Sequence, residues 1–172
     1  MTRYSAQFAP FRERMVAEKL PTTFIDNFAY YYEQLLAGDD GMIPDSALVP
    51  IASLPDSERL PVHLTEVGRA AVKQTVIIKL NGGLGTGMGL TGPKSLLVVK
   101  EGLTFLDIIA RQAIDIGAPL LLMNSFATDQ ESLAVLAHYP ALQGDWPLSF
   151  LQHKQPKVVA ADFSPACRPD DR

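Results

Sequence analysis

A glycine-rich segment that directly follows a strand-like apolar run is the feature that most limits how this chain can fold. Thr75–Leu80 is rich in β-branched residues, which is typical of a buried strand. Residues 80–89, LNGGLGTGMG, then hold five glycines. Glycine lets the backbone approach a ligand without an intervening Cβ, and successive exposed N–H groups form a concavity for anions. The segment therefore predicts a phosphate-binding loop, to which the nearby Lys94 adds a positive charge.

Two familiar phosphate loops match this segment only in part. Gly87–Gly92 satisfies the dinucleotide pattern G-x-G-x-x-G, but it begins several residues beyond the strand instead of at its end. Residues 92–95, GPKS, resemble the end of a Walker A loop, but Pro93 separates glycine from lysine and removes an amide donor. A nicotinamide-dependent oxidoreductase therefore stays a minor alternative.

Strand-like and helix-like patterns alternate through the second half of the chain. This alternation favours an α/β fold with a parallel sheet that binds ligands at the carboxyl ends of its strands, and with 75–80 as its central strand. Proline-rich residues 41–61 predict an extended connection. We expect helices at 5–20, 26–37, 64–73, 105–116 (capped by Thr104) and 128–138 (capped by Thr128). We expect strands at 75–80, 119–123 and 148–152, and a second strand or an extended segment at 95–99.

Composition narrows the class of protein. The chain has 172 residues, 47% hydrophobic and 20% charged, with a net charge of −4, so no basic face is expected for a nucleic acid. No apolar run reaches the roughly 18 residues needed to span a bilayer, and the N-terminus lacks a signal-peptide core. We expect a cytoplasmic protein. Cys167 is the single cysteine, and the three histidines, His63, His138 and His153, lack metal-ligand spacing.

The glycine segment also resembles a known family signature. Lys79–Gly89 followed by Gly92–Leu96 closely resembles the signature of the UTP–glucose-1-phosphate uridylyltransferase (UDP-glucose pyrophosphorylase) family. The resemblance covers residues 25–157. It continues through residues 41–44 (GMIP), 104–107 (TFLD), 123–126 (MNSF) and 150–152 (FLQ).

The resemblance implies a Rossmann-like nucleotidyltransferase sheet with a parallel core, preceded by an N-terminal helical segment. It divides the chain into residues 1–61, the helical segment and connection; 62–159, the N-terminal part of the UTP-binding domain; and 160–172, a polar tail. Proteins of this family continue beyond this length, so the chain resembles an N-terminal portion with a truncated catalytic domain.

The family reaction implied by the resemblance is transfer of a uridylyl group from UTP to glucose 1-phosphate, which releases pyrophosphate. Lys94 would be the catalytic residue, since it would contact the triphosphate and stabilise negative charge on the leaving group. Gln152 would hydrogen-bond the uracil edge. The other UTP-binding positions implied are Leu80, Asn81, Gly82 and Gly83.

Mg²⁺ is the implied cofactor, with its aspartate ligand expected outside this chain, so no metal ligand is assigned within it. UTP and glucose 1-phosphate are the implied partners; neither nucleic acid nor membrane is expected. Two alternatives stay open: a UTP-binding fragment without turnover, and a pyrophosphorylase for another sugar 1-phosphate.

Overall fold

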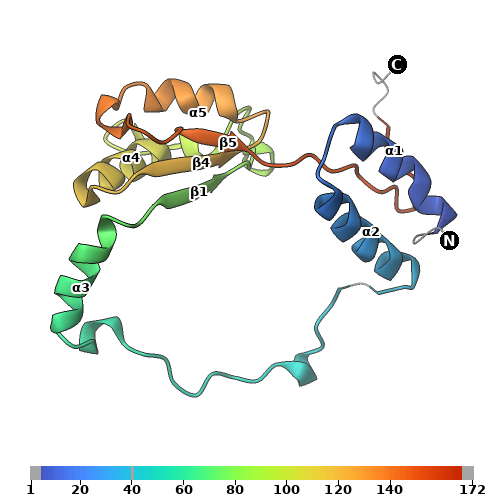
Figure 1. Ribbon diagram of the computed structural model, residues 1–172, viewed down its shortest axis with the longest axis horizontal. Coiled ribbons are helices and arrows are strands. Elements are labelled where there is room, and N and C mark those ends of the chain that lie inside the picture. The colour runs from blue at the N-terminus through green and yellow to red at the C-terminus, as the bar shows by residue number, and fades with distance from the viewer. Residues whose placement is uncertain (1–4, 40, 168–172) are drawn as a thin grey trace. The chain divides into compact units, whose positions relative to one another are not determined.

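The computed structural model describes residues 5–39 and 41–167, which form two compact units (Figure 1). The N-terminal unit comprises residues 5–39, 41–53 and 153–167, and the sheet unit comprises Leu54–Gln152. The second unit carries every residue for which the sequence predicts a site role. The two units are therefore described separately.

A three-stranded parallel sheet is the centre of the sheet unit (Figure 1). In the first pair of strands, the register runs from Ile77 opposite Leu120 to Asn81 opposite Asn124. In the second pair, it ends with Asn124 opposite Leu151. The expected α/β fold with a parallel core and preceding helices is confirmed. The strands, in the order in which they lie side by side, are β1 (Ile77–Asn81), β4 (Leu120–Asn124) and β5 (Ser149–Leu151).

One expectation about the strands is wrong. β4 is the central strand and β1 lies at an edge of the described sheet, whereas the sequence favoured a central position for 75–80. The segment 95–99, expected as a second strand or an extended segment, is a strand only in its last part. Lys94–Leu96 is a 3₁₀ turn, after which β2 (Val98–Lys100) pairs antiparallel with β3 (Leu103–Thr104). Glu101 and Gly102, with φ of 52° and 76°, reverse the chain between them.

Helices α4 (Phe105–Ile116) and α5 (Asp129–Leu136) cover one face of the sheet, because their apolar side chains pack with those of β4 in one cluster. The expected cap at Thr104 is confirmed: its hydroxyl accepts the N–H of Asp107, whose carboxylate accepts the Thr104 N–H. The core cluster comprises Leu106, Ala110, Ala113, Leu120, Leu122 and Leu136.

Helix α5 has Thr128 at its N-cap position as expected, but its cap bonding and its end differ. Thr128 does not cap it with a side-chain hydrogen bond; its hydroxyl accepts the N–H of Ser125 at 3.0 Å instead. The helix ends at Leu136, two residues before His138. The remaining helix of this unit, α3 (His63–Val72), contains no buried residue. Short 3₁₀ turns occur at Ser57–Arg59, Thr86–Met88, Lys94–Leu96 and Pro140–Leu142.

In the N-terminal unit, α1 (Ala9–Ala17) and α2 (Thr22–Leu36) share an aromatic core. The first helix is shorter than expected, because Lys19 has a left-handed φ of 57°. The second begins four residues earlier than expected, and the Pro21 carbonyl accepts the N–H of Phe24. Further 3₁₀ turns lie at Ala6–Phe8 and Asp45–Ala47. The core comprises Phe8, Phe11, Met15, Ile25, Ala29 and Tyr32.

Residues 153–167 pack onto these two helices. Tyr32 donates its hydroxyl to the Phe163 carbonyl at 2.9 Å, and Arg14 donates to the Ala166 carbonyl at 3.0 Å. An antiparallel bridge between Val158 and Pro165 closes the segment on itself. Across residues 5–39 and 41–167, every helix is too short or too polar to cross a bilayer.

Candidate functional site

The glycine-rich segment folds back on itself directly after β1. The Gly85 N–H donates to the Gly92 carbonyl at 3.0 Å, and the Lys94 N–H donates to the Gly83 carbonyl at 3.1 Å. Between these bonds a 3₁₀ turn ends at Gly89, whose φ of 72° is left-handed and favours glycine. The loop therefore returns Lys94 to the end of the strand from which it began.

This closure places the Lys94 side chain beside Gly83. A Cβ atom at Gly83 would lie 3.9 Å from the Lys94 Cδ, and Lys94 is exposed. Among the described loop residues, the N–H groups of Gly83 and Leu84 make no backbone hydrogen bond within the loop. The Lys94 side chain and the Gly83 N–H group thus lie close together, a combination that suits an anion.

Gln152 reaches the same place from β5. Its N–H donates to the Asn124 carbonyl at 2.8 Å, which extends the pairing of β5 with β4 by one residue. A Cβ atom at Gly82 would lie 2.8 Å from Cδ and 2.9 Å from Nε2 of Gln152. The carboxamide therefore packs directly on Gly82, and only glycine leaves room for it.

Asn81 is placed differently from its neighbours, because its side chain points into the unit. It is 4% exposed, and its Nδ2 donates to Asn124 Oδ1 and to Ser132 Oγ, both at 2.8 Å. Its side chain is therefore committed to the interior, and only its backbone can face a ligand. Leu80 has an exposed side chain, and its carbonyl accepts from Lys79 Nζ at 2.8 Å.

A buried polar network below the loop was not predicted from the sequence. Asn124 Nδ2 and Ser149 Oγ both donate to Asp129 Oδ1 at 2.8 Å, and Asn124 in turn accepts from Asn81. The network links the carboxyl ends of β1 and β4 to β5 and to the start of α5. The sequence feature that could have indicated this network is the presence of polar residues at the ends of the apolar strand segments.

Glu131 is a second residue that the sequence analysis missed. Its Oε2 would lie 2.8 Å from a Cβ atom at Gly92, so the carboxylate packs against the loop. Thr128-x-x-Glu131 has the spacing of a capping box, yet Thr128 is engaged with Ser125. The described part of the chain holds no group of three or more His, Cys, Asp or Glu side chains suited to a metal ion.

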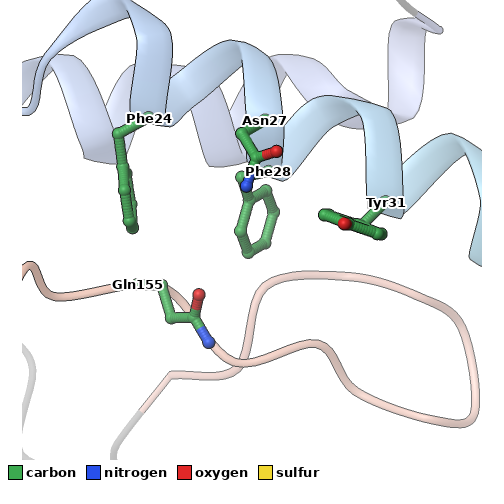
Figure 2. A pocket seen from close by; sticks show the side chains of 5 residues that line it. All are labelled: Phe24, Asn27, Phe28, Tyr31 and Gln155. Atoms are coloured by element: carbon green, nitrogen blue, oxygen red, sulfur yellow. The ribbon is translucent and has the colours of Figure 1, made fainter. Parts of the chain in front are cut away.

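A hollow of about 290 Å³ occurs in the N-terminal unit, outside the glycine loop. Figure 2 shows four α2 side chains projecting toward the segment that carries Gln155. Three of its five lining residues are aromatic and none is charged, so it lacks the cationic group that a phosphate would need. It is lined by Phe24, Asn27, Phe28, Tyr31 and Gln155.

Comparison with known proteins places the chain in one family. The family model described as UTP–glucose-1-phosphate uridylyltransferase matches residues 25–172. The enzyme of that name from Solanum tuberosum is 38% identical over 134 residues, which are 74% of this chain and 26% of the relative. The Saccharomyces cerevisiae enzyme is 47% identical over 76 residues, which are 41% of this chain and 15% of the relative.

Solved structures agree with the sequence relatives. UDP-glucose pyrophosphorylase from Leishmania major, a mutant in complex with UDP-glucose, matches 98% of this chain with a TM-score of 0.86 and 34% identity. The Trypanosoma brucei UDP-glucose phosphorylase matches 97% with a TM-score of 0.79 and 36% identity. The chain spans 36% and 35% of those two solved chains. This chain belongs to the UTP–glucose-1-phosphate uridylyltransferase family.

Proposed function

We propose that this chain binds UTP at the carboxyl end of β1. The observation that carries the proposal is the meeting of three separate segments around Gly82 and Gly83. The strand end provides the glycines, the returning loop provides Lys94, and the end of β5 provides Gln152. An ammonium group suits a triphosphate, and a carboxamide offers the donor and acceptor that a uracil edge needs.

In the whole protein, we propose that this site serves uridylyl transfer from UTP to glucose 1-phosphate. A phosphate oxygen of glucose 1-phosphate attacks the α-phosphorus of UTP in line and forms a new P–O bond. The bond between the α-phosphorus and the bridging oxygen breaks, and pyrophosphate leaves with that electron pair. Lys94 stabilises the negative charge that develops on the leaving group, while the loop amides align the phosphates.

Mg²⁺ is part of this proposal as the charge partner of the phosphates. Mg²⁺ is commonly bound by one or two carboxylates together with substrate phosphates. As the family resemblance implies, its aspartate ligand is expected in a part of the family fold outside this chain. The cytoplasmic location expected from the sequence also stays a prediction.

Isothermal titration calorimetry of the purified 172-residue chain with UTP tests the binding proposal. We expect UTP to bind more tightly than inorganic triphosphate, because the Gln152 carboxamide adds hydrogen bonds to the uracil edge. Equal affinities for UTP and triphosphate would contradict the role of Gln152. An absence of heat with both ligands would contradict the site itself.

Binding without turnover is the second candidate function. It is favoured because this chain covers only 26% of the length of the Solanum tuberosum relative. The two candidates differ in pyrophosphate release, which only the transferase produces. The third candidate is a pyrophosphorylase for another sugar 1-phosphate. To test it, the whole protein is assayed in parallel with the 1-phosphates of glucose, galactose and N-acetylglucosamine, and the rates of pyrophosphate release are compared.

A further inference from the structure

Asp129 is the charged member of the polar network at the strand ends, and the proposed reaction does not use it. It is the first residue of α5, directly after the N-cap residue Thr128, and it is half-buried. Its Oδ1 atom accepts from Asn124 Nδ2 on β4 and from Ser149 Oγ on β5, both at 2.8 Å. One carboxylate oxygen therefore joins two neighbouring strands to the beginning of a helix.

The network reaches both residues that meet at the proposed uracil site. Asn124 Oδ1 accepts from Asn81 Nδ2 at 2.8 Å, and Asn81 immediately precedes Gly82. The Asn124 carbonyl accepts the Gln152 N–H at 2.8 Å, and Ser149 begins the strand that ends one residue before Gln152. Asn124 thus bonds to one neighbouring strand through its side chain and to the other through its main chain.

Burial makes these hydrogen bonds decide where the strand ends lie. Asn124 and Asn81 are both buried, and a buried polar group that loses its partner is costly to leave unpaired. Asn124 Nδ2 has the Asp129 carboxylate as its acceptor, so removal of that carboxylate frees the carboxamide to rotate. Rotation would break the bond to Asn81 and change how Gln152 lies against Gly82.

A general effect of charge at the start of α5 does not account for this arrangement. A carboxylate in the first turn stabilises any helix, and Glu131 supplies a second one in the first turn of α5. That effect requires no contact with a strand. Asp129 instead accepts hydrogen bonds from side chains on two strands, so its acceptor oxygen has a role that its charge alone does not explain.

We propose that Asp129 is a positioning residue for recognition of the uracil base. Through Asn124 and Ser149 it fixes where Gln152 lies against Gly82, and it acts without a contact to the nucleotide. The proposed triphosphate contacts lie on the returning glycine loop, outside this network. Asp129 therefore influences the affinity for the base and not the affinity for the phosphates. The inference rests on the proposed UTP site.

Affinities of the 172-residue chain for UTP and for inorganic triphosphate test this role. Asp129→Ala should weaken UTP binding at least about fivefold and leave triphosphate binding within about twofold of the parent. Asp129→Asn keeps an acceptor oxygen and should restore the parental ratio of the two affinities. Ser149→Ala removes one of the two hydrogen bonds to the carboxylate, and it should change the ratio less, in the same direction.

Asp107→Ala is the matched control for Asp129→Ala. Asp107 is also a first-turn aspartate that accepts a side-chain hydroxyl, from Tyr139, but it belongs to α4 and lies outside the network. Its removal should lower the melting temperature and leave the ratio of UTP to triphosphate affinity at the parental value. A parental ratio in Asp129→Ala, or an equal change of the ratio in both variants, would overturn the proposal.

Hydrogen exchange without ligand tests the positioning step separately from nucleotide binding. The Gln152 amide should exchange at least about tenfold faster in Asp129→Ala than in Asp107→Ala, because its acceptor is the Asn124 carbonyl. Equal affinities of the parent for UTP and triphosphate would contradict the role of Gln152, and the proposal with it. Parental exchange at this amide in Asp129→Ala, in a chain that prefers UTP, would overturn the positioning role alone.

Discussion

A side chain at position 82 would collide with Gln152, because the Gln152 carboxamide lies where a Cβ atom would be. Gly82→Ala should displace Gln152, which is the flexible end of an exposed side chain, with a change in melting temperature of only about 2 °C or less. UTP affinity should fall at least about fivefold, by about 1 kcal/mol, since the base loses its partner.

Gly87→Ala is the control for that variant. A Cβ atom at Gly87 would meet nothing within 4 Å, so this change should leave UTP affinity within about twofold of the parent. Calorimetry and thermal melting of the three proteins complete the test. Parental affinity in Gly82→Ala would remove Gln152 from the site.

Lys94 is the charged residue of the loop. Its contribution to UTP affinity should be measurable with this chain alone, whereas its contribution to kcat requires the whole protein. Lys94→Ala should weaken UTP binding by the chain at least about tenfold, about 1.4 kcal/mol, because a charge-assisted contact to the triphosphate is lost. Lys94→Arg should restore this only in part, since a planar guanidinium replaces a compact ammonium group beside Gly83.

Lys100→Ala is the matched control, because Lys100 is an exposed lysine whose nearest acidic group, on Glu101, is 4.0 Å away. It should bind UTP as the parent does at 0.15 M salt, where exposed charges are screened. Equal loss in both variants would indicate general attraction of an anion instead of a defined lysine. Whole-protein Lys94→Ala should lose about 10²–10³-fold in kcat.

Among the elements, α4 offers the clearest pH-dependent test. Burial raises the pKa of Asp107, but hydrogen bonds from Thr104 and Tyr139 and the charge of Arg111 outweigh it, so the pKa lies below its ordinary value. A lowered pKa in the folded state stabilises the protein above the unfolded pKa of about 3.9, and that contribution disappears as pH falls through the folded pKa.

Asp107→Ala should therefore reduce the free energy of unfolding at pH 7 by about 1–2 kcal/mol, the usual cost of losing a helix cap. The difference from the parent should shrink progressively below about pH 4. Urea unfolding at several pH values measures both. Asp115→Ala, at an exposed position of the same helix, should leave the free energy of unfolding at pH 7 within about 0.5 kcal/mol of the parent. A constant difference across pH would show that the carboxylate charge is irrelevant.

For the whole molecule, the prediction is that the 172-residue chain binds UTP without releasing measurable pyrophosphate. The chain spans 26% of the Solanum tuberosum relative, and its described residues lack a metal cluster. Without alignment of the substrates and neutralisation of the phosphate charge, the activation barrier should be higher by several kcal/mol. An enzyme-coupled pyrophosphate assay with UTP, glucose 1-phosphate and Mg²⁺ checks this; steady release that Lys94→Ala abolishes would refute it.

The sequence by itself determined the local elements whose cause is local. The β-branched run ending at Leu80, the glycines that allow the loop to close, and the Thr104–Asp107 capping box each act within a few residues. The family signature led to the family that the comparisons confirm. These features could be predicted because neighbouring residues decide them through φ preferences and short-range hydrogen bonds.

Only the tertiary structure decided which distant residues meet. The sequence left open whether 95–99 is a strand or an extended segment. In the structure only Val98–Lys100 is a strand, and the turn at Glu101–Gly102 pairs it in an antiparallel hairpin. Strand order made β4 central and left β1 at the edge. Likewise, Asn81 is buried because Asn124 and Ser132 lie opposite it, and Gln152 reaches Gly82 through the β4–β5 register. Strand pairing joins residues far apart along the chain, so no local pattern encodes it.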